Sequence, residues 1–151
     1  MSVSVGQVAP DFTLVNQRGE PTTLADLRGR KVVLVFYPFA FSATCTQEMC
    51  ELRDRRGEFD DDTVLLGISV DTKHALRVFA AQEGLGFDLL SDFWPHGAVA
   101  QEYGVFLAES GKSTRATFVI DREGVVRWSV VNPPDQARDP QDYRTALAEL
   151  P

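Results

Sequence analysis

Cysteine is scarce in this chain, with two residues among 151. Two cysteines cannot form the disulfide scaffold that staples small secreted proteins, and a chain of this length buries enough surface to fold without one. In a reducing compartment a cysteine pair is more often catalytic or metal-binding than structural. Cys45 and Cys50 are therefore the first candidates for chemistry.

Long apolar runs and net positive charge are also missing. The longest uncharged apolar run, residues 32–41, is too short to span a bilayer, and the first residues lack the basic and apolar regions of a secretory leader. We therefore expect a cytoplasmic protein. With 15 basic against 22 acidic side chains the net charge is −7, which repels nucleic acids and anionic membranes. Neither is expected as a partner.

Linkers, internal repeats and low-complexity tracts are absent as well, and no shift in composition marks a boundary. The hydrophobic fraction of 44% is that of an ordinary globular protein. We expect one domain over residues 1–151.

The hydrophobic pattern predicts an α/β fold. Residues 31–37 form a β-branched and aromatic run without alternation, typical of a strand buried on both faces, and residues 63–70 predict a second buried strand. Residues 9–15 with a turn at 16–19 predict an edge hairpin. The other expected elements are a helical turn at 23–27, helices at 72–83 and 97–103, strands at 87–90, 117–120 and 125–130, and a helix opening at Asp139-Pro140. This order predicts a thioredoxin-like three-layer sandwich with a central mixed sheet and an N-terminal hairpin.

Cys45 follows a predicted buried strand. Residues 44–47 read TCTQ, the form of a capping box, which predicts a helix beginning at Cys45. Its sulfur would then lie at the carboxyl end of the sheet, where α/β sheets place ligands. Free N–H groups and partial positive charge at a helix N-terminus favour the nucleophilic thiolate. The alternative is that Cys45 is a small apolar residue of the core.

A family resemblance begins at this cysteine. Residues 38–45 read PFAFSATC, the P-x-x-x-[T/S]-x-x-C form of peroxiredoxins. The likeness continues in APDF at 9–12, LSDFWPHG at 90–97, YGV at 103–105 and RATFVID at 115–121, and is strongest to the alkyl hydroperoxide reductase E subfamily. The resemblance implies a peroxidase that reduces hydrogen peroxide, organic hydroperoxides and peroxynitrite through a Cys45 sulfenic acid, with no metal, haem or flavin cofactor.

The resemblance also assigns roles to residues. Cys45 would be the peroxidatic cysteine, Pro38 would shield the pocket, Ser42 would donate a hydroxyl where the family usually has Thr, and Arg115 would lie beside the sulfur. A thiolate that attacks a peroxide leaves charge on the distal oxygen, which Ser42 and Arg115 can stabilise. Glu48, three residues after Cys45 on the same helical face, is expected to orient an arginine rather than touch substrate.

Cys50 departs from that subfamily, whose members are one-cysteine enzymes reduced by a low-molecular-weight thiol and a redoxin. Its spacing from Cys45 instead resembles the bacterioferritin-comigratory or Q-type peroxiredoxins, in which the second cysteine resolves the first. Five residues of ideal helix separate the Cα atoms by about 8 to 9 Å, beyond disulfide reach, so resolution requires the first turn to unwind. Either Cys50 resolves Cys45 and a thioredoxin-type or mycoredoxin-type partner reduces the disulfide, or Cys50 is a bystander.

Other interpretations remain open at this point. Oxidation of Cys45 also suits a non-catalytic redox sensor or holdase, whereas a thiol-disulfide oxidoreductase lacks its C-x-x-C motif here. A zinc site built from both cysteines, His74 and His96 would need separate elements to converge, and is not expected. By resemblance, the loop at 92–96 borders a dimer interface, which favours a homodimer over aromatics that merely cover the core.

Overall fold

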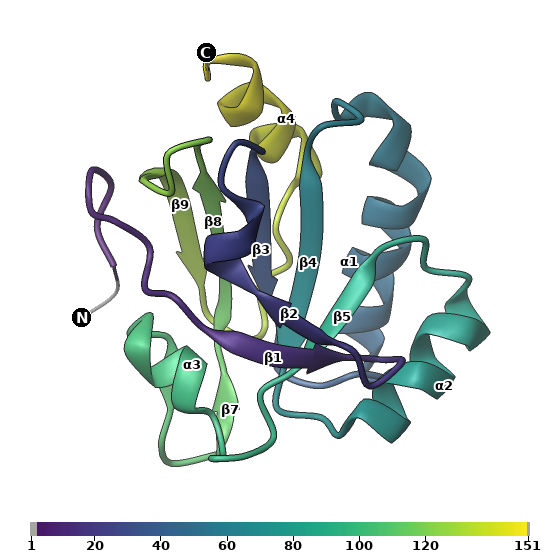
Figure 1. Ribbon diagram of the computed structural model, residues 1–151. Helices are drawn as coiled ribbons and strands as arrows, with labels where there is room; N and C mark the ends of the chain where they lie inside the picture. Colours follow the sequence, from purple (N-terminus) through teal and green to yellow (C-terminus); the bar gives the residue numbers. More distant parts are fainter. Residues whose placement is uncertain (1–2, 151) are drawn as a thin grey trace.

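The computed structural model describes residues 3–150. Its main sheet has the strand order β2-β1-β5-β4-β3-β8-β9 (Figure 1). These strands are β1 (Thr13–Asn16), β2 (Pro21–Thr23), β3 (Val32–Phe36), β4 (Val64–Ser69), β5 (Asp88–Ser91), β8 (Arg115–Ile120) and β9 (Val126–Asn132). The helices are α1 (Ala43–Arg55), α2 (Lys73–Glu83), α3 (Ala98–Glu102) and α4 (Pro140–Ala148), with 3-10 turns η1 (Leu24–Leu27) and η2 (Arg56–Glu58).

The sheet is mixed. β3, β4 and β5 run parallel to one another, while β8 is antiparallel to β3 and β9 is antiparallel to β8. β1 and β2 form an antiparallel hairpin that joins the edge of the sheet through β5. The predicted mixed sheet and N-terminal hairpin are confirmed.

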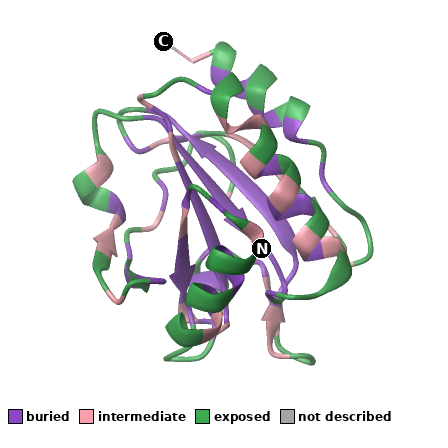
Figure 2. Ribbon diagram, turned by 90° about the vertical axis from the view of Figure 1, so that its right-hand side faces the viewer, coloured by how far each residue is buried: buried purple, intermediate pink, exposed green. Residues whose placement is uncertain are grey.

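Two apolar cores lie on opposite faces of the sheet and give the fold its three layers. Every residue of β3 is buried, and alternate side chains enter different cores because successive side chains of a strand point to opposite faces. Val33 and Val35 pack in the core with α1, α2 and α4, whereas Leu34 and Phe36 pack in the core with α3 and the N-terminal segment. Figure 2 shows these strands buried, with the exposed sides of the helices facing outward.

The start of α1 differs from the prediction. The helix begins at Ala43 rather than Cys45, with Ser42 as its N-cap in extended conformation (φ −70°, ψ 150°). The carbonyl of Ser42 accepts the N–H of Thr46 at 2.9 Å. The acceptor of this first helical hydrogen bond lies two residues before Thr44, the predicted cap. The capping-box interpretation of residues 44–47 was therefore wrong. Cys45 still lies in the first turn.

Other helix starts agree with their local chemistry. Asp139 caps α4 by accepting the N–H of Gln141 at 2.9 Å, with Pro140 as the first helical residue.

The sequence did not indicate the small second sheet, in which β6 (Phe106–Leu107) pairs with β7 (Lys112–Ser113), because two-residue strands leave no periodic pattern. Within residues 3–150, none of the helices combines the length and hydrophobicity needed to cross a membrane.

Candidate active site

The sheet register brings Cys45 and Arg115 together. β3 leads through a short loop into α1, so Cys45 lies near the carboxyl end of β3. β8 is antiparallel to β3 and pairs Ala116 with Phe36, which places Arg115, its first residue, at the same edge. Two residues far apart in the sequence therefore meet where a strand gives way to a helix.

Cys45 and Arg115 form a buried pair. Nη1 of Arg115 donates to Sγ of Cys45 at 3.2 Å. The exposed fraction of Cys45 is 0% and that of Arg115 is 3%. A guanidinium beside a sulfur, in the first turn of a helix, stabilises the charged and nucleophilic form of a cysteine. Cys45 thus differs from a core cysteine whose sulfur has only apolar neighbours.

Arg115 is held in place by two further contacts. Its Nη1 also donates to Oε1 of Glu48 at 2.7 Å, and its Nε donates to the carbonyl of Pro134 at 2.7 Å. Across residues 3–150, Nη2 of Arg115 enters no hydrogen bond with the protein. Within residues 3–150, Nη2 therefore keeps its capacity to donate to another acceptor.

Arg138 is the residue of this site that sequence reasoning missed. It donates to Glu48 from its backbone N–H at 2.7 Å, from Nε at 3.0 Å and from Nη2 at 2.8 Å. Its Nη1 donates to the carbonyls of Phe36 and Ala116, at 2.6 and 2.8 Å, which joins the ends of β3 and β8. The only sequence signal is its position before the helix cap Asp139, and this does not distinguish it among twelve arginines.

The two arginines control the charge of Glu48. Burial alone would raise the pKa of this carboxyl, but the hydrogen bonds and charge of Arg138, together with the charge of Arg115, lower its pKa below the ordinary value. Glu48 is 4% exposed and is thus an ionised group in the interior, paired with both guanidinium groups.

Pro38 and Ser42 lie on the loop between β3 and α1. Pro38 is buried, and Asp71 anchors the loop by accepting the N–H of Ala40 at 2.8 Å. Ser42 is exposed, and its hydroxyl donates to the carbonyl of Phe39 at 3.2 Å. The structure thus places Ser42 one residue before the helix of Cys45, without a hydrogen bond to its sulfur among the described residues.

Cys50 lies in the same helix as Cys45 but in different surroundings. It is half-buried, and its Sγ donates to Oε1 of Glu83, at the end of α2, at 3.3 Å. Burial raises the pKa of the Cys50 thiol, and the hydrogen bond to Glu83 raises it further. Both cysteines are free thiols.

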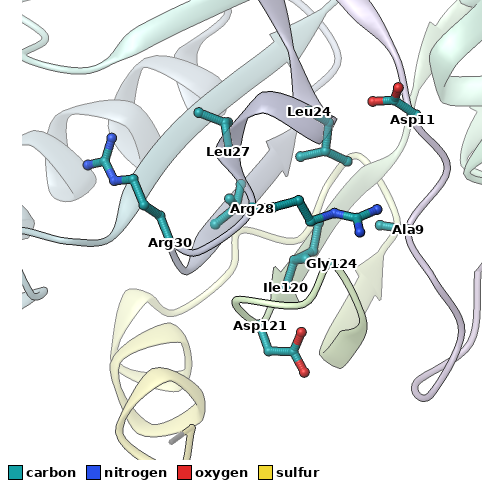
Figure 3. Close-up of a pocket in the computed structure, with 10 residues that line it drawn as sticks. Ala9, Asp11, Leu24, Leu27, Arg28, Arg30, Ile120, Asp121 and Gly124 are labelled. Atoms are coloured by element: carbon teal, nitrogen blue, oxygen red, sulfur yellow. The ribbon is translucent and has the colours of Figure 1, made fainter.

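A pocket at the other end of the sheet contains none of these residues. Figure 3 shows it between the segment before β3 and the turn after β8, with Arg28 reaching across to Gly124.

In the part of the chain that the structure describes, no three side chains of His, Cys, Asp or Glu are grouped so that they could hold a metal ion.

Comparison with known proteins identifies the family. The family model described as "AhpC/TSA family" matches residues 5–129. The chain belongs to the AhpC/TSA family. This AhpC/TSA protein is 47% identical over 150 residues to alkyl hydroperoxide reductase E of Mycobacterium tuberculosis, covering 98% of each chain. It is 42% identical over 133 residues to a putative peroxiredoxin bcp of Coxiella burnetii, covering 83% of this chain and 87% of that one.

Solved structures agree with these relatives of the AhpC/TSA protein. Peroxidoxin BcpB of Mycobacterium tuberculosis superposes with a TM-score of 0.83 at 34% identity, covering 95% of this chain and 94% of that one. A reduced 2-Cys peroxiredoxin of Plasmodium vivax gives a TM-score of 0.86 at 27% identity, covering 97% and 81%. The resemblance read from the sequence is confirmed, together with the thioredoxin-like fold and the activity of a thiol-dependent peroxidase.

Proposed function

We propose that this protein works as a single domain in which Cys45 reduces hydrogen peroxide, organic hydroperoxides and peroxynitrite. The observation that carries the proposal is the 3.2 Å contact between Arg115 Nη1 and Cys45 Sγ in the first turn of α1. The thiolate attacks one peroxide oxygen and the O–O bond breaks. The other oxygen leaves with the bonding electrons and takes up a proton, while the first remains as the sulfenic acid of Cys45.

Positioned donors stabilise the charge that develops on the leaving oxygen. Nη2 of Arg115, which has no hydrogen bond within residues 3–150, donates to that oxygen, and the hydroxyl of Ser42 turns from Phe39 to do the same. Glu48 fixes the guanidinium by accepting a hydrogen bond from Nη1 of Arg115. Pro38 is buried in the loop beside the site and excludes water. Because Cys45 is 0% exposed, peroxide enters when this loop moves.

The sulfenic acid is recycled through Cys50. Its attack on the sulfur of Cys45 gives an intramolecular disulfide, which a thioredoxin-type or mycoredoxin-type protein reduces. The first turn of α1 is suited to the unwinding this needs, since Ser42 makes no side-chain cap and the turn holds no acidic residue. If Cys50 is a bystander, a low-molecular-weight thiol reduces Cys45 directly.

Turnover tests the proposal against a sensor or holdase. Peroxide consumption is followed with excess dithiol reductant for the parent, Cys45→Ser and Cys50→Ser proteins. We expect many equivalents of peroxide consumed by the parent and none above background by Cys45→Ser. A parent that stops after a single equivalent acts as a sensor, and an active Cys45→Ser protein contradicts the assignment of Cys45.

A homodimer in the cytoplasm is the assembly we favour. Phe93 and Trp94 are 47% and 78% exposed on the loop that follows β5, and large exposed aromatics support a protein partner. The reaction needs reduced thiols, which the cytoplasm maintains. Light scattering during size-exclusion chromatography should give twice the monomer mass for the parent and the monomer mass for Trp94→Glu. A monomeric parent contradicts the dimer.

A further inference from the structure

Cys50 is fixed against the end of a neighbouring helix. Its Sγ donates to the carboxylate of Glu83, the last residue of α2, at 3.3 Å. One turn further along α1, the guanidinium of Arg53 donates to the backbone carbonyl of the same residue. The second half of α1 is thus tied to α2 at the residue that faces the Cys50 sulfur.

The Cys50 sulfur carries its proton in these surroundings. Burial raises the pKa of the thiol, and Glu83 raises it through its hydrogen bond and charge. Two other charged groups act on it from its own helix, because Arg53 lowers its pKa and Asp54 raises it. Since the thiolate is the nucleophile of disulfide chemistry, the proton must leave Cys50 as it attacks.

We propose that Glu83 is the catalytic proton acceptor for Cys50 in the resolving step. This inference rests on the resolving role proposed above. The Cys50 proton passes to the Glu83 carboxylate while the Cys50 sulfur bonds to the Cys45 sulfur. The S–O bond of the sulfenic acid breaks, and its hydroxyl leaves as water after taking up one proton. One disulfide and one water form, and no further oxidant or reductant is needed.

The rest of α1 allows Cys50 to stay beside Glu83 during this step. Residues 43–47 precede Glu48, which is anchored by Arg115 and Arg138. Unwinding these residues releases Cys45 while leaving both the Glu48 ion pairs and the Cys50 contact intact. Cys45 is therefore the cysteine that moves, and it approaches a thiol already hydrogen-bonded to its base.

Glu83→Gln tests the proposal, with Glu51→Gln as the matched control. Glu51 is exposed on α1, and its substitution removes the same charge while leaving the hydrogen bond between Cys50 and Glu83 in place. Rapid mixing with peroxide followed by acid quench and thiol trapping gives the rates of Cys45 oxidation and of disulfide formation separately. At neutral pH we expect Glu83→Gln to slow disulfide formation at least tenfold and Glu51→Gln to leave it unchanged, since general bases contribute about 100-fold or more.

The pH profile separates a base from a mere neighbouring charge. Well above the pKa of the Cys50 thiol no base is needed, so the Glu83→Gln and parent rates should converge. If Glu83 only suppresses the thiolate, Glu83→Gln forms the disulfide faster than the parent at neutral pH. An equal or faster rate overturns the inference and leaves the resolving role standing. Failure of the parent to form the disulfide overturns both, while Cys45 oxidation in the same samples still reports on the peroxidase proposal.

Discussion

Arg138 donates three hydrogen bonds to the carboxylate of Glu48. It donates from its backbone and from its side chain, and both residues are almost fully buried, at 5% and 4% exposed. The segment between β9 and α4 is thereby fastened to the helix that carries Cys45. Through Glu48 the contact extends to Arg115, so the position of the guanidinium beside the sulfur depends on a residue that does not touch the sulfur.

Arg138→Ala should destabilise the fold. The substitution leaves the Glu48 carboxylate paired with Arg115 alone and removes the donor to the Phe36 and Ala116 carbonyls. Breaking one partner of a buried ion pair costs about 3 to 5 kcal/mol in the free energy of unfolding. Urea denaturation measures the change. Arg144→Ala, an exposed arginine of α4, is the control, and a similar small loss for both variants would contradict this account.

Acid should weaken the protein through Glu48. Its pKa in the folded state is lowered below the ordinary value of 4.5, because Arg138 and Arg115 outweigh the opposing effect of burial. The stabilisation is therefore fully present above about pH 4.5 and is lost as the pH falls through the lowered pKa. The urea midpoint, measured from pH 6 down to pH 3, should fall more steeply for the parent than for Glu48→Gln. Parallel curves would show that Glu48 does not contribute.

Arg115→Leu should slow the attack on peroxide. Loss of a preorganised charged donor lowers a rate by about 100- to 1,000-fold. Arg115→Lys should also be slow, because an ammonium cannot reach Glu48, the Pro134 carbonyl and the leaving oxygen at once. Stopped-flow rates of Cys45 oxidation test this, with Arg77→Leu on the exposed side of α2 as control. A second-order rate equal to that of the parent in a folded Arg115→Leu protein would refute the role.

The hydroxyl of Ser42 should matter less. Removing one neutral donor costs about 1 kcal/mol, so Ser42→Ala is expected to reduce the peroxide rate up to roughly tenfold. Ser42→Thr keeps the hydroxyl, and its β-branched side chain restricts the rotamer. It should match or exceed the parent rate. A Ser42→Ala protein as fast as the parent would exclude the hydroxyl from the reaction.

The sequence allowed the sheet to be predicted because β3 is a continuous apolar run rich in β-branched residues and β4 is a second, mostly apolar run. Cys45 could be found from its place after such a run. Arg115 could be named only through the family resemblance, since its approach to Cys45 depends on the register of β8 against β3. Arg138 could not be found, because it lies in an irregular segment whose course is set by tertiary contacts.

The start of α1 shows a different limit. Ser42 and Thr44 both belong to residue types that cap helices, and residues 44–47 fit the capping motif. Ser42 is the N-cap by its backbone conformation, and its side chain makes no capping hydrogen bond. Thr44 lies inside the helix. The local sequence pattern therefore predicted correctly that Cys45 lies in the first turn of the helix, but it misplaced the start of the helix by two residues.

The most direct measurement of the central claim is peptide mapping after one equivalent of hydrogen peroxide. Free thiols are trapped, and cleavage after Glu48 separates Cys45 and Cys50 onto different peptides. We predict a Cys45–Cys50 crosslink in the parent, oxidised Cys45 in Cys50→Ser, and an unmodified Cys50 in Cys45→Ser. A Cys45 that stays reduced in the parent would contradict the claim that this residue reacts with peroxide.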